Sequence, residues 1–182
     1  PRINRKDCKS MKLMIASDIH GSAYWCKRLL EKYNEESPDI LLILGDILYH
    51  GPRNDLPQDY APKEVVAMLN PLADKILCVR GNCDSEVDGM VLNFPIMAEY
   101  ALLHINGTTI FATHGHKYSE DNPPKIPAGT VLLCGHTHIA KIAEHEGFTY
   151  VNPGSVSIPK EGTGHGYMIF EDGEFIRKPL ED

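Results

Sequence analysis

Five short apolar runs in this chain each end in a turn that contains glycine and carries aspartate, asparagine or histidine. A continuous apolar run of about five residues is typical of a strand that is buried on both faces of a sheet. Glycine then lets the backbone turn sharply, because it adopts conformations that other residues avoid. The five turns are Asp18–Gly21, Gly45–Asp46, Gly81–Asp84, His114–His116 and Gly135–His138. Polar side chains rarely follow buried strands so regularly for packing alone, so the pattern predicts a functional site at the strand ends.

The first half of the chain alternates strand patterns with helix patterns. Strands are predicted over 12–17, 40–44 and 76–80, and helices begin after the capping residue Ser22 and at Pro62. This order is typical of strand–helix–strand units, in which the strands run parallel and ligands gather at their carboxyl ends. The polar loop 49–61 is long for a loop without structure of its own, which suggests a functional role.

The second half changes to hairpin patterns, with turns predicted at Asn106-Gly107, Glu146-Gly147 and Asp172-Gly173. We therefore expect two sheets, the first parallel and covered by helices and the second mixed, packed face to face in an α/β sandwich. Residues 11–182 are expected to form a single domain. We interpret residues 1–10 as a flexible N-terminal extension or tag remnant that precedes a native start at Met11.

Composition argues against several classes of protein. A net charge of -7 and a pI near 5.7 do not favour an extended nucleic-acid-binding surface. The five cysteines form an odd set without a C-x-x-C pair, which favours a reducing cytoplasm over a disulfide framework or a zinc ribbon. The longest apolar stretch, 40–48, is interrupted by Gly45 and Asp46, so neither a membrane span nor a signal peptide is predicted. The sequence is compatible with a homo-oligomer and does not decide the oligomeric state.

The turns supply more metal ligands than one ion needs. The candidates are Asp18, His20, Asp46, Asn82, His114, His136 and His138. Seven nitrogen and oxygen ligands, without sulfur unless Cys83 joins them, suit two ions better than one tetrahedral zinc, and Asp46 is the best candidate for a bridge. The ligand mixture favours Mn²⁺, with Zn²⁺, Fe, Ni²⁺ or Mg²⁺ as alternatives. Two divalent ions against two carboxylates leave a charge of about +2, so a small anionic substrate is expected.

These motifs resemble the calcineurin-like metallophosphoesterases, in the order D-x-H-G, G-D, G-N-x-D, H-G-H and G-H-x-H. The small bacterial phosphodiesterases of the YfcE type are similar also in His50–Asn54 and Asn152–Ser155, and the resemblance extends from Met11 to Arg177. It implies a four-layer α/β/β/α sandwich of two mixed β-sheets. It also implies that Asp18, His20, Asp46 and His138 hold one metal while Asp46, Asn82, His114 and His136 hold the other. Most relatives have histidine where this chain has Cys83.

The resemblance implies a metal-dependent phosphodiesterase, in which a hydroxide that bridges the two ions attacks phosphorus. Asn82 is the first catalytic candidate, followed by Cys83 and Asp84. Candidate substrate-binding residues are Asn82, Arg53, His50 and His116. For Arg53 and His50 a solvated position in the loop is an equal alternative, and for His116 a supporting role behind the ligands is favoured.

Two other functions stay open from the sequence. Better-known relatives are phosphomonoesterases or protein phosphatases, but a chain of 182 residues has little room for a groove that would hold a protein substrate. A eukaryotic retromer subunit of the same fold is a non-catalytic scaffold. Such a scaffold can lose metal ligands, whereas this chain has all seven candidates.

Overall fold

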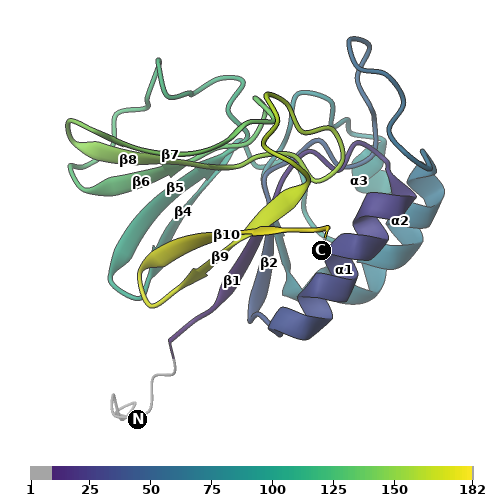
Figure 1. The fold of residues 1–182 in the computed structure, drawn as a ribbon, viewed down its shortest axis with the longest axis horizontal. Helices are drawn as coiled ribbons and strands as arrows, with labels where there is room; N and C mark the ends of the chain where they lie inside the picture. The colour runs from purple at the N-terminus through teal and green to yellow at the C-terminus, as the bar shows by residue number, and fades with distance from the viewer. Residues whose placement is uncertain (1–9, 182) are drawn as a thin grey trace.

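The structure, a computed structural model, describes residues 10–181, so residues 1–9 of the predicted extension lie outside the described part (Figure 1). The helical elements are α1 (Ala23–Glu36), α2 (Pro62–Leu69), the 3-10 helix η2 (Asn70–Lys75) and α3 (Asp88–Val91). The strands are β1 (Leu13–Ala16), β2 (Ile40–Ile43), β3 (Ile76–Cys78), β4 (Tyr100–Ile105), β5 (Thr108–Thr113), β6 (Thr130–Leu133), β7 (Ala140–His145), β8 (Phe148–Pro153), β9 (Gly166–Glu171) and β10 (Glu174–Pro179).

The strands form two mixed five-stranded sheets, which confirms the predicted fold class. The first sheet has the order β10-β9-β1-β2-β3, and the second has the order β4-β5-β6-β8-β7. The expectation that the first sheet is purely parallel is wrong, because β9 pairs antiparallel with β1 and brings β10 with it. The apolar run 167–170 of β9 explains this position, since it is buried on both faces next to β1.

Alternate residues of the central strands serve two different cores, which is why their sequences are continuously apolar. In β1, Leu13 and Ile15 point between the sheets and pack with Val131 and Val151 of the second sheet. Met14 and Ala16 point the other way, into the core beneath the helices α1 and α2. Figure 1 shows these two helices on one side of the first sheet, with the second sheet on its other side.

The outer face of the second sheet differs in one respect from the four-layer prediction. Its apolar side chains, such as Phe111, Leu132 and Tyr150, are packed against Tyr118 and Ile126 of the segment 114–129. Within residues 10–181 this segment contains no helix. Three prolines in the segment, at positions 123, 124 and 127, explain this, because proline disrupts helical hydrogen bonding. An irregular layer therefore replaces the fourth, helical one.

Local sequence signals explain where the elements begin and turn. The side chain of Ser22 accepts a hydrogen bond from the backbone N–H of Trp25, so the predicted cap of α1 is confirmed. Pro62 stands in the first turn of α2, as predicted. The turn between β4 and β5 has positive φ angles of 51° at Asn106 and 82° at Gly107, as a two-residue hairpin requires.

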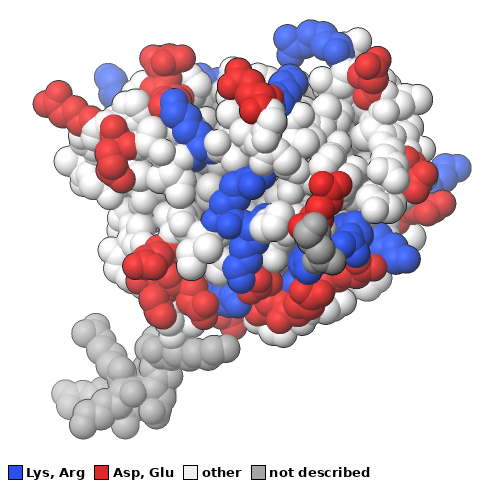
Figure 2. Space-filling model, viewed as in Figure 1, with Lys and Arg blue, Asp and Glu red and all other residues white. Residues whose placement is uncertain are grey.

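The surface of the described chain carries both signs of charge. On the face in Figure 2, basic and acidic side chains are interspersed. None of the helices within residues 10–181 combines the length and apolar character that crossing a membrane requires.

One ion-pair cluster ties the end of α1 to the first sheet. The carboxylate of Glu36 accepts hydrogen bonds from Lys12, which precedes β1, from Lys178 of β10 and from the hydroxyl of Tyr167 in β9. Partial burial alone would raise the pKa of Glu36, but the two lysines outweigh it and lower the pKa to about 2. The cluster therefore stabilises the folded state while Glu36 is ionised.

We predict that Glu36→Gln lowers the free energy of unfolding at pH 7 by about 1–3 kcal/mol, because charged hydrogen bonds to two lysines are lost. Since the folded pKa of Glu36 is depressed, its contribution is complete above the ordinary value of 4.5 and is lost as pH falls toward about 2. Urea unfolding at several pH values measures this. The control is Glu35→Gln, since Glu35 is exposed and forms an i,i+3 ion pair with Lys32, and its loss is expected to cost less than about 0.5 kcal/mol. An equal effect of both substitutions, or one independent of pH, would contradict the account.

Candidate metal centre

The polar turns predicted from the sequence meet at one edge of the sandwich, beyond the carboxyl ends of strands from both sheets. Backbone hydrogen bonds join the turns directly. The N–H of Asp18 donates to Gly45 O at 3.1 Å, and the N–H of His20 donates to Asp46 O at 2.9 Å. In the second sheet, the N–H of Gly135 donates to His114 O at 2.8 Å. These bonds join the turns that carry Asp18, His20 and Asp46 in the first sheet, and the turns that carry His114, His136 and His138 in the second.

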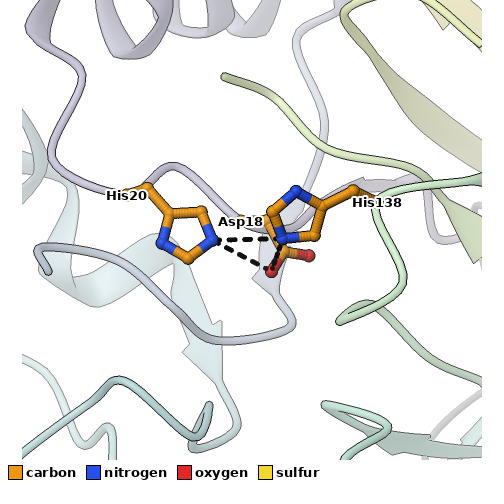
Figure 3. Close-up of side chains that lie close together, drawn as sticks. All are labelled: Asp18, His20 and His138. Atoms are coloured by element: carbon orange, nitrogen blue, oxygen red, sulfur yellow. Dashed lines mark hydrogen bonds and ion pairs between the residues drawn. The ribbon is translucent and has the colours of Figure 1, made fainter. Parts of the chain in front are cut away.

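Asp18, His20 and His138 form a first cluster, in which the three side chains point toward one another (Figure 3). The Nε2 atoms of His20 and His138 lie 3.2 Å apart. Asp18 Oδ1 lies 3.5 Å from His20 Nε2 and 3.2 Å from His138 Nε2. All three side chains are buried.

Hydrogen bonds to backbone carbonyls fix which nitrogen of each imidazole carries the proton. His20 Nδ1 donates to Tyr49 O at 2.8 Å, and His138 Nδ1 donates to Ile158 O at 2.6 Å. In a neutral imidazole the other nitrogen, Nε2, then presents a lone pair. Two lone pairs and a carboxylate oxygen thus face one another, and buried Asp18 Oδ1 has no hydrogen-bond partner in the described structure. This donor set fits a bound cation.

Asp46, His114, His136 and Asn82 form a second cluster beside the first. His114 Nδ1 donates to Leu44 O at 2.6 Å, so its Nε2 faces the cluster. That atom lies 3.3 Å from Asp46 Oδ2, 3.0 Å from Asn82 Oδ1 and 3.3 Å from His136 Nδ1. Electron-rich atoms again converge, and the set of two imidazoles, a carboxylate and an amide oxygen fits a second divalent ion.

Asp46 stands between the two clusters. Its Oδ2 atom lies 3.3 Å from His114 Nε2 in the second cluster and 3.7 Å from His20 Nε2 in the first. The other oxygen, Oδ1, accepts a hydrogen bond from the backbone N–H of Cys83 at 2.8 Å, which orients the carboxylate. One carboxylate oxygen is therefore within reach of both groups of ligands.

The pKa values of Asp18 and His114 show that these positions favour nearby positive charge, whereas the pKa of His136 favours a neutral imidazole. Burial alone would raise the pKa of Asp18, but the imidazoles of His138 and His20 hold it well below its usual range. Burial would likewise lower the pKa of His114, but the contact with Asp46 raises it to about 9. For His136, burial and the neighbouring His114 lower the pKa to about 4. In the absence of a metal ion, protons take up part of this demand for positive charge.

The candidate ligands occupy unusual backbone conformations. Ten non-glycine residues in the described chain have a positive φ angle, and half of them are candidate ligands. These five are Asp18, His20, Asp46, His136 and His138, with φ between 50° and 66°. Such residues cost about 1–3 kcal/mol each and persist where the surrounding structure imposes them, often at functional sites. The backbone strain at this edge therefore marks it as a site under functional constraint.

Asp84, predicted as a catalytic candidate, is buried beneath the second cluster. Its carboxylate accepts hydrogen bonds from the backbone N–H groups of Asp46 at 2.8 Å, Ile47 at 2.9 Å and Gly81 at 2.7 Å. Asp84 thereby ties the turn after β2 to the turn after β3. Gly81 and Asp46 lie so close together that a Cβ atom on residue 81 would be 2.1 Å from Asp46 Oδ1. Glycine is therefore required at this position. This arrangement makes Asp84 a positioning residue for Asp46.

The clusters open into a cavity of about 370 Å³. Its wall is formed by His20, Asp46, Gly51, Pro52, Arg53, Asn54, Asn82, Cys83, His136, Thr137, His138 and Lys160. Three of the candidate catalytic or substrate-binding residues, Arg53, Asn82 and Cys83, thus line this cavity. His50 is outside this wall and contacts the rings of Tyr49 and Tyr60. His116 is exposed, also outside the wall, with its ring 5.5 Å from that of His114.

Several residues that sequence reasoning did not select support or line the site. Ser17 Oγ donates to Asp18 Oδ2 at 2.6 Å, and the hydroxyls of Ser155 and Ser157 donate to Asp18 O. Asn152 Nδ2 donates to Gly135 O at 2.8 Å, which holds the turn after β6. Ser17 and Ser157 carry no local signal of such a role, whereas Asn152 and Ser155 lie in a motif that the sequence shares with the YfcE-type phosphodiesterases. Lys160 lies in a polar loop without any distinguishing pattern.

The fold and the site together define a class, a hydrolase with the metallophosphoesterase fold. The chain belongs to the calcineurin-like phosphoesterase superfamily, whose domain matches residues 11–173. The predicted family resemblance is thus confirmed, and the family implies bound divalent metal ions.

Individual relatives agree with this assignment. The chain is 48% identical over 163 residues to phosphodiesterase YfcE of Escherichia coli strain K12. The aligned region covers 89% of this chain and 88% of that protein. A solved structure of YfcE, described as a phosphoesterase from E. coli, superposes with a TM-score of 0.92 at 45% identity and 94% coverage of each chain. Vacuolar Protein Sorting 29 from Cryptosporidium parvum has a TM-score of 0.60 at 18% identity, covering 93% of this chain and 96% of that one, and shows the fold alone.

Proposed function

We propose that this chain is a metal-dependent phosphodiesterase that hydrolyses small phosphodiesters with two divalent ions. The proposed ligands are Asp18, His20, Asp46, Asn82, His114, His136 and His138. The observation that carries the proposal is the convergence of imidazole nitrogen and carboxylate oxygen atoms in two clusters, with Asp46 within reach of both. The name of its 48% identical relative, phosphodiesterase YfcE, supports a diester as the substrate.

Two divalent ions held by these residues would activate a water molecule at neutral pH and would neutralise charge on the phosphoryl oxygens. The chain's own residues orient these groups. Asn82 turns its Oδ1 toward the second cluster, 3.0 Å from His114 Nε2, while its Nδ2 lies 3.2 Å from Cys83 Sγ on the cavity wall. One N–H of Asn82 donates to Cys83 Sγ, and we propose that the other donates to a phosphoryl oxygen, with Arg53 as a second donor from the 49–61 loop.

Among the histidines and the cysteine of the described cavity wall, we find only a weak proton donor for the leaving group. Each histidine in the wall, namely His20, His136 and His138, is also a proposed ligand. Cys83 lies beside them, but a thiol is a weak hydrogen-bond donor. We therefore propose that the enzyme favours diesters whose leaving group departs without help, such as aryl esters.

The metal and the compartment are also matters of proposal. Manganese is the proposed ion, because a site with four imidazoles, two carboxylates and an amide suits a borderline cation better than Ca²⁺. A reducing cytoplasm is the proposed compartment, and the free state of Cys26, Cys78, Cys83 and Cys134 is consistent with it.

We predict that chelation abolishes hydrolysis of bis(p-nitrophenyl) phosphate and that Mn²⁺ restores it at least as well as Mg²⁺. Release of nitrophenolate by protein whose metal content has been verified measures this. The monoester p-nitrophenyl phosphate is expected to react more slowly than the diester. Full activity of the metal-free protein would refute the metal-dependent mechanism, and faster hydrolysis of the monoester would favour a phosphomonoesterase.

Asp46→Asn is predicted to be the most damaging ligand substitution, because it weakens a residue shared by both clusters. We expect fewer than two ions per chain and a fall in kcat of about 100-fold or more. Elemental analysis and steady-state kinetics measure the two effects. The matched control is Asp55→Asn, an exposed carboxylate of the 49–61 loop, which should keep both ions and normal turnover. Two bound ions and normal turnover in Asp46→Asn would show that Asp46 is not the bridge.

A further inference from the structure

Two cationic side chains lie on the wall of the metal cavity outside the proposed ligand set, Arg53 and Lys160. They come from different loops, the loop 49–61 and the loop between β8 and β9. Both residues are exposed, and no hydrogen bond or ion pair of either side chain occurs within residues 10–181. The single carboxylate on this wall is that of Asp46, which is proposed to bind metal. The two cations therefore have no anionic partner in the cavity.

The loop that carries Lys160 is fastened to the first ligand cluster. The backbone N–H of Lys160 donates to His138 O at 3.0 Å. His138 Nδ1 donates a hydrogen bond to Ile158 O at 2.6 Å, and Thr163 Oγ1 donates to Lys160 O at 3.0 Å. The backbone of Lys160 is thus held beside a proposed metal ligand, and from there Lys160 lines the cavity.

The charge of the site exceeds what a simple diester can balance. Two divalent ions against the carboxylates of Asp18 and Asp46 leave about +2, or about +1 with a bound hydroxide, and Arg53 and Lys160 raise the latter to about +3. A phosphodiester group carries a single negative charge. A second phosphate on the same molecule would bring the substrate to about -3, which matches the cavity better.

We propose that Lys160 forms a subsite for a second phosphate group on the substrate, next to the scissile diester to which Arg53 is proposed to donate. Lys160 is then a specificity residue, and the substrate class is a phosphodiester that also carries a phosphate monoester. This inference rests on the proposed function, because it places the scissile group at the two metal clusters. The alternative is that Lys160 contacts the scissile phosphate itself.

Binding of two nucleotides to Mn²⁺-loaded protein, measured by calorimetry, tests the subsite without requiring turnover. The probes are thymidine 3′,5′-bisphosphate and thymidine 5′-monophosphate, which differ by one phosphate. The wild-type chain is expected to bind the bisphosphate about 10-fold more tightly at low ionic strength, since an exposed cation contributes modestly and is screened by salt. Lys160→Ala should reduce this ratio to about 2, and Lys160→Arg should keep most of it.

Lys63→Ala is the matched control, because Lys63 is an exposed lysine of α2 that does not line the cavity. It should leave the ratio unchanged. Equal binding of both nucleotides by the wild-type chain, or an equal loss of both affinities in Lys160→Ala, would overturn the subsite. An equal loss of both affinities would instead indicate that Lys160 contacts the 5′-phosphate, which both nucleotides carry.

Turnover separates a failure of the subsite from a failure of the proposed function. Thymidine 5′-(p-nitrophenyl phosphate) is compared with the same ester carrying a 3′-phosphate. The 3′-phosphate is expected to lower KM about 10-fold in the wild-type chain and about 2-fold in Lys160→Ala. Hydrolysis of both esters with the same KM would contradict the subsite alone. No hydrolysis of either ester, with the nucleotide-binding preference intact, would contradict the proposed phosphodiesterase activity and leave the subsite supported.

Discussion

The site depends on close contacts between imidazole nitrogens and carboxylate oxygens that repel one another unless positive charge lies among them. Nε2 of His20, Nε2 of His138 and Oδ1 of Asp18 lie within 3.5 Å of one another in a buried position. Backbone carbonyls hold the protons of both imidazoles on the far side of the rings. Such a group of acceptors is stable only when positive charge lies among them, whether protons or metal ions supply it. The same argument applies to Asp46, His114 and His136 in the second cluster.

Packing and hydrogen bonds elsewhere in the fold stabilise this arrangement of mutually repelling atoms. Ligands come from both sheets, so the apolar contacts between the sheets, such as those of Ile15 and Leu42 with Val131, keep the two clusters in register. Five ligand residues have left-handed backbone conformations, which tertiary structure must enforce. Asp84 contributes by accepting three backbone hydrogen bonds from the turns that carry Asp46 and Gly81. The site is therefore a product of the whole fold.

The sequence predicted the features that leave a local signature. Buried parallel strands such as β2 are continuously apolar, and Asn106-Gly107 defines a hairpin, so most strands and the edge that carries the turns were predictable. Other features depend on contacts between distant segments. No local sequence signal assigns β9 to the first sheet. No local signal predicts that Asp84 is buried beneath Asp46 either. Lys160 is a single lysine in a polar loop, and its place on the cavity wall follows only from the tertiary structure.

The most direct test of the account is anomalous X-ray diffraction from crystals of the Mn²⁺-loaded chain. The account predicts two anomalous peaks about 3.5–4 Å apart, one between Asp18 and His138 and the other between Asn82 and His136, with Asp46 touching both. A single peak, or two peaks without contact to Asp46, would contradict the central claim that these turns form one two-metal site.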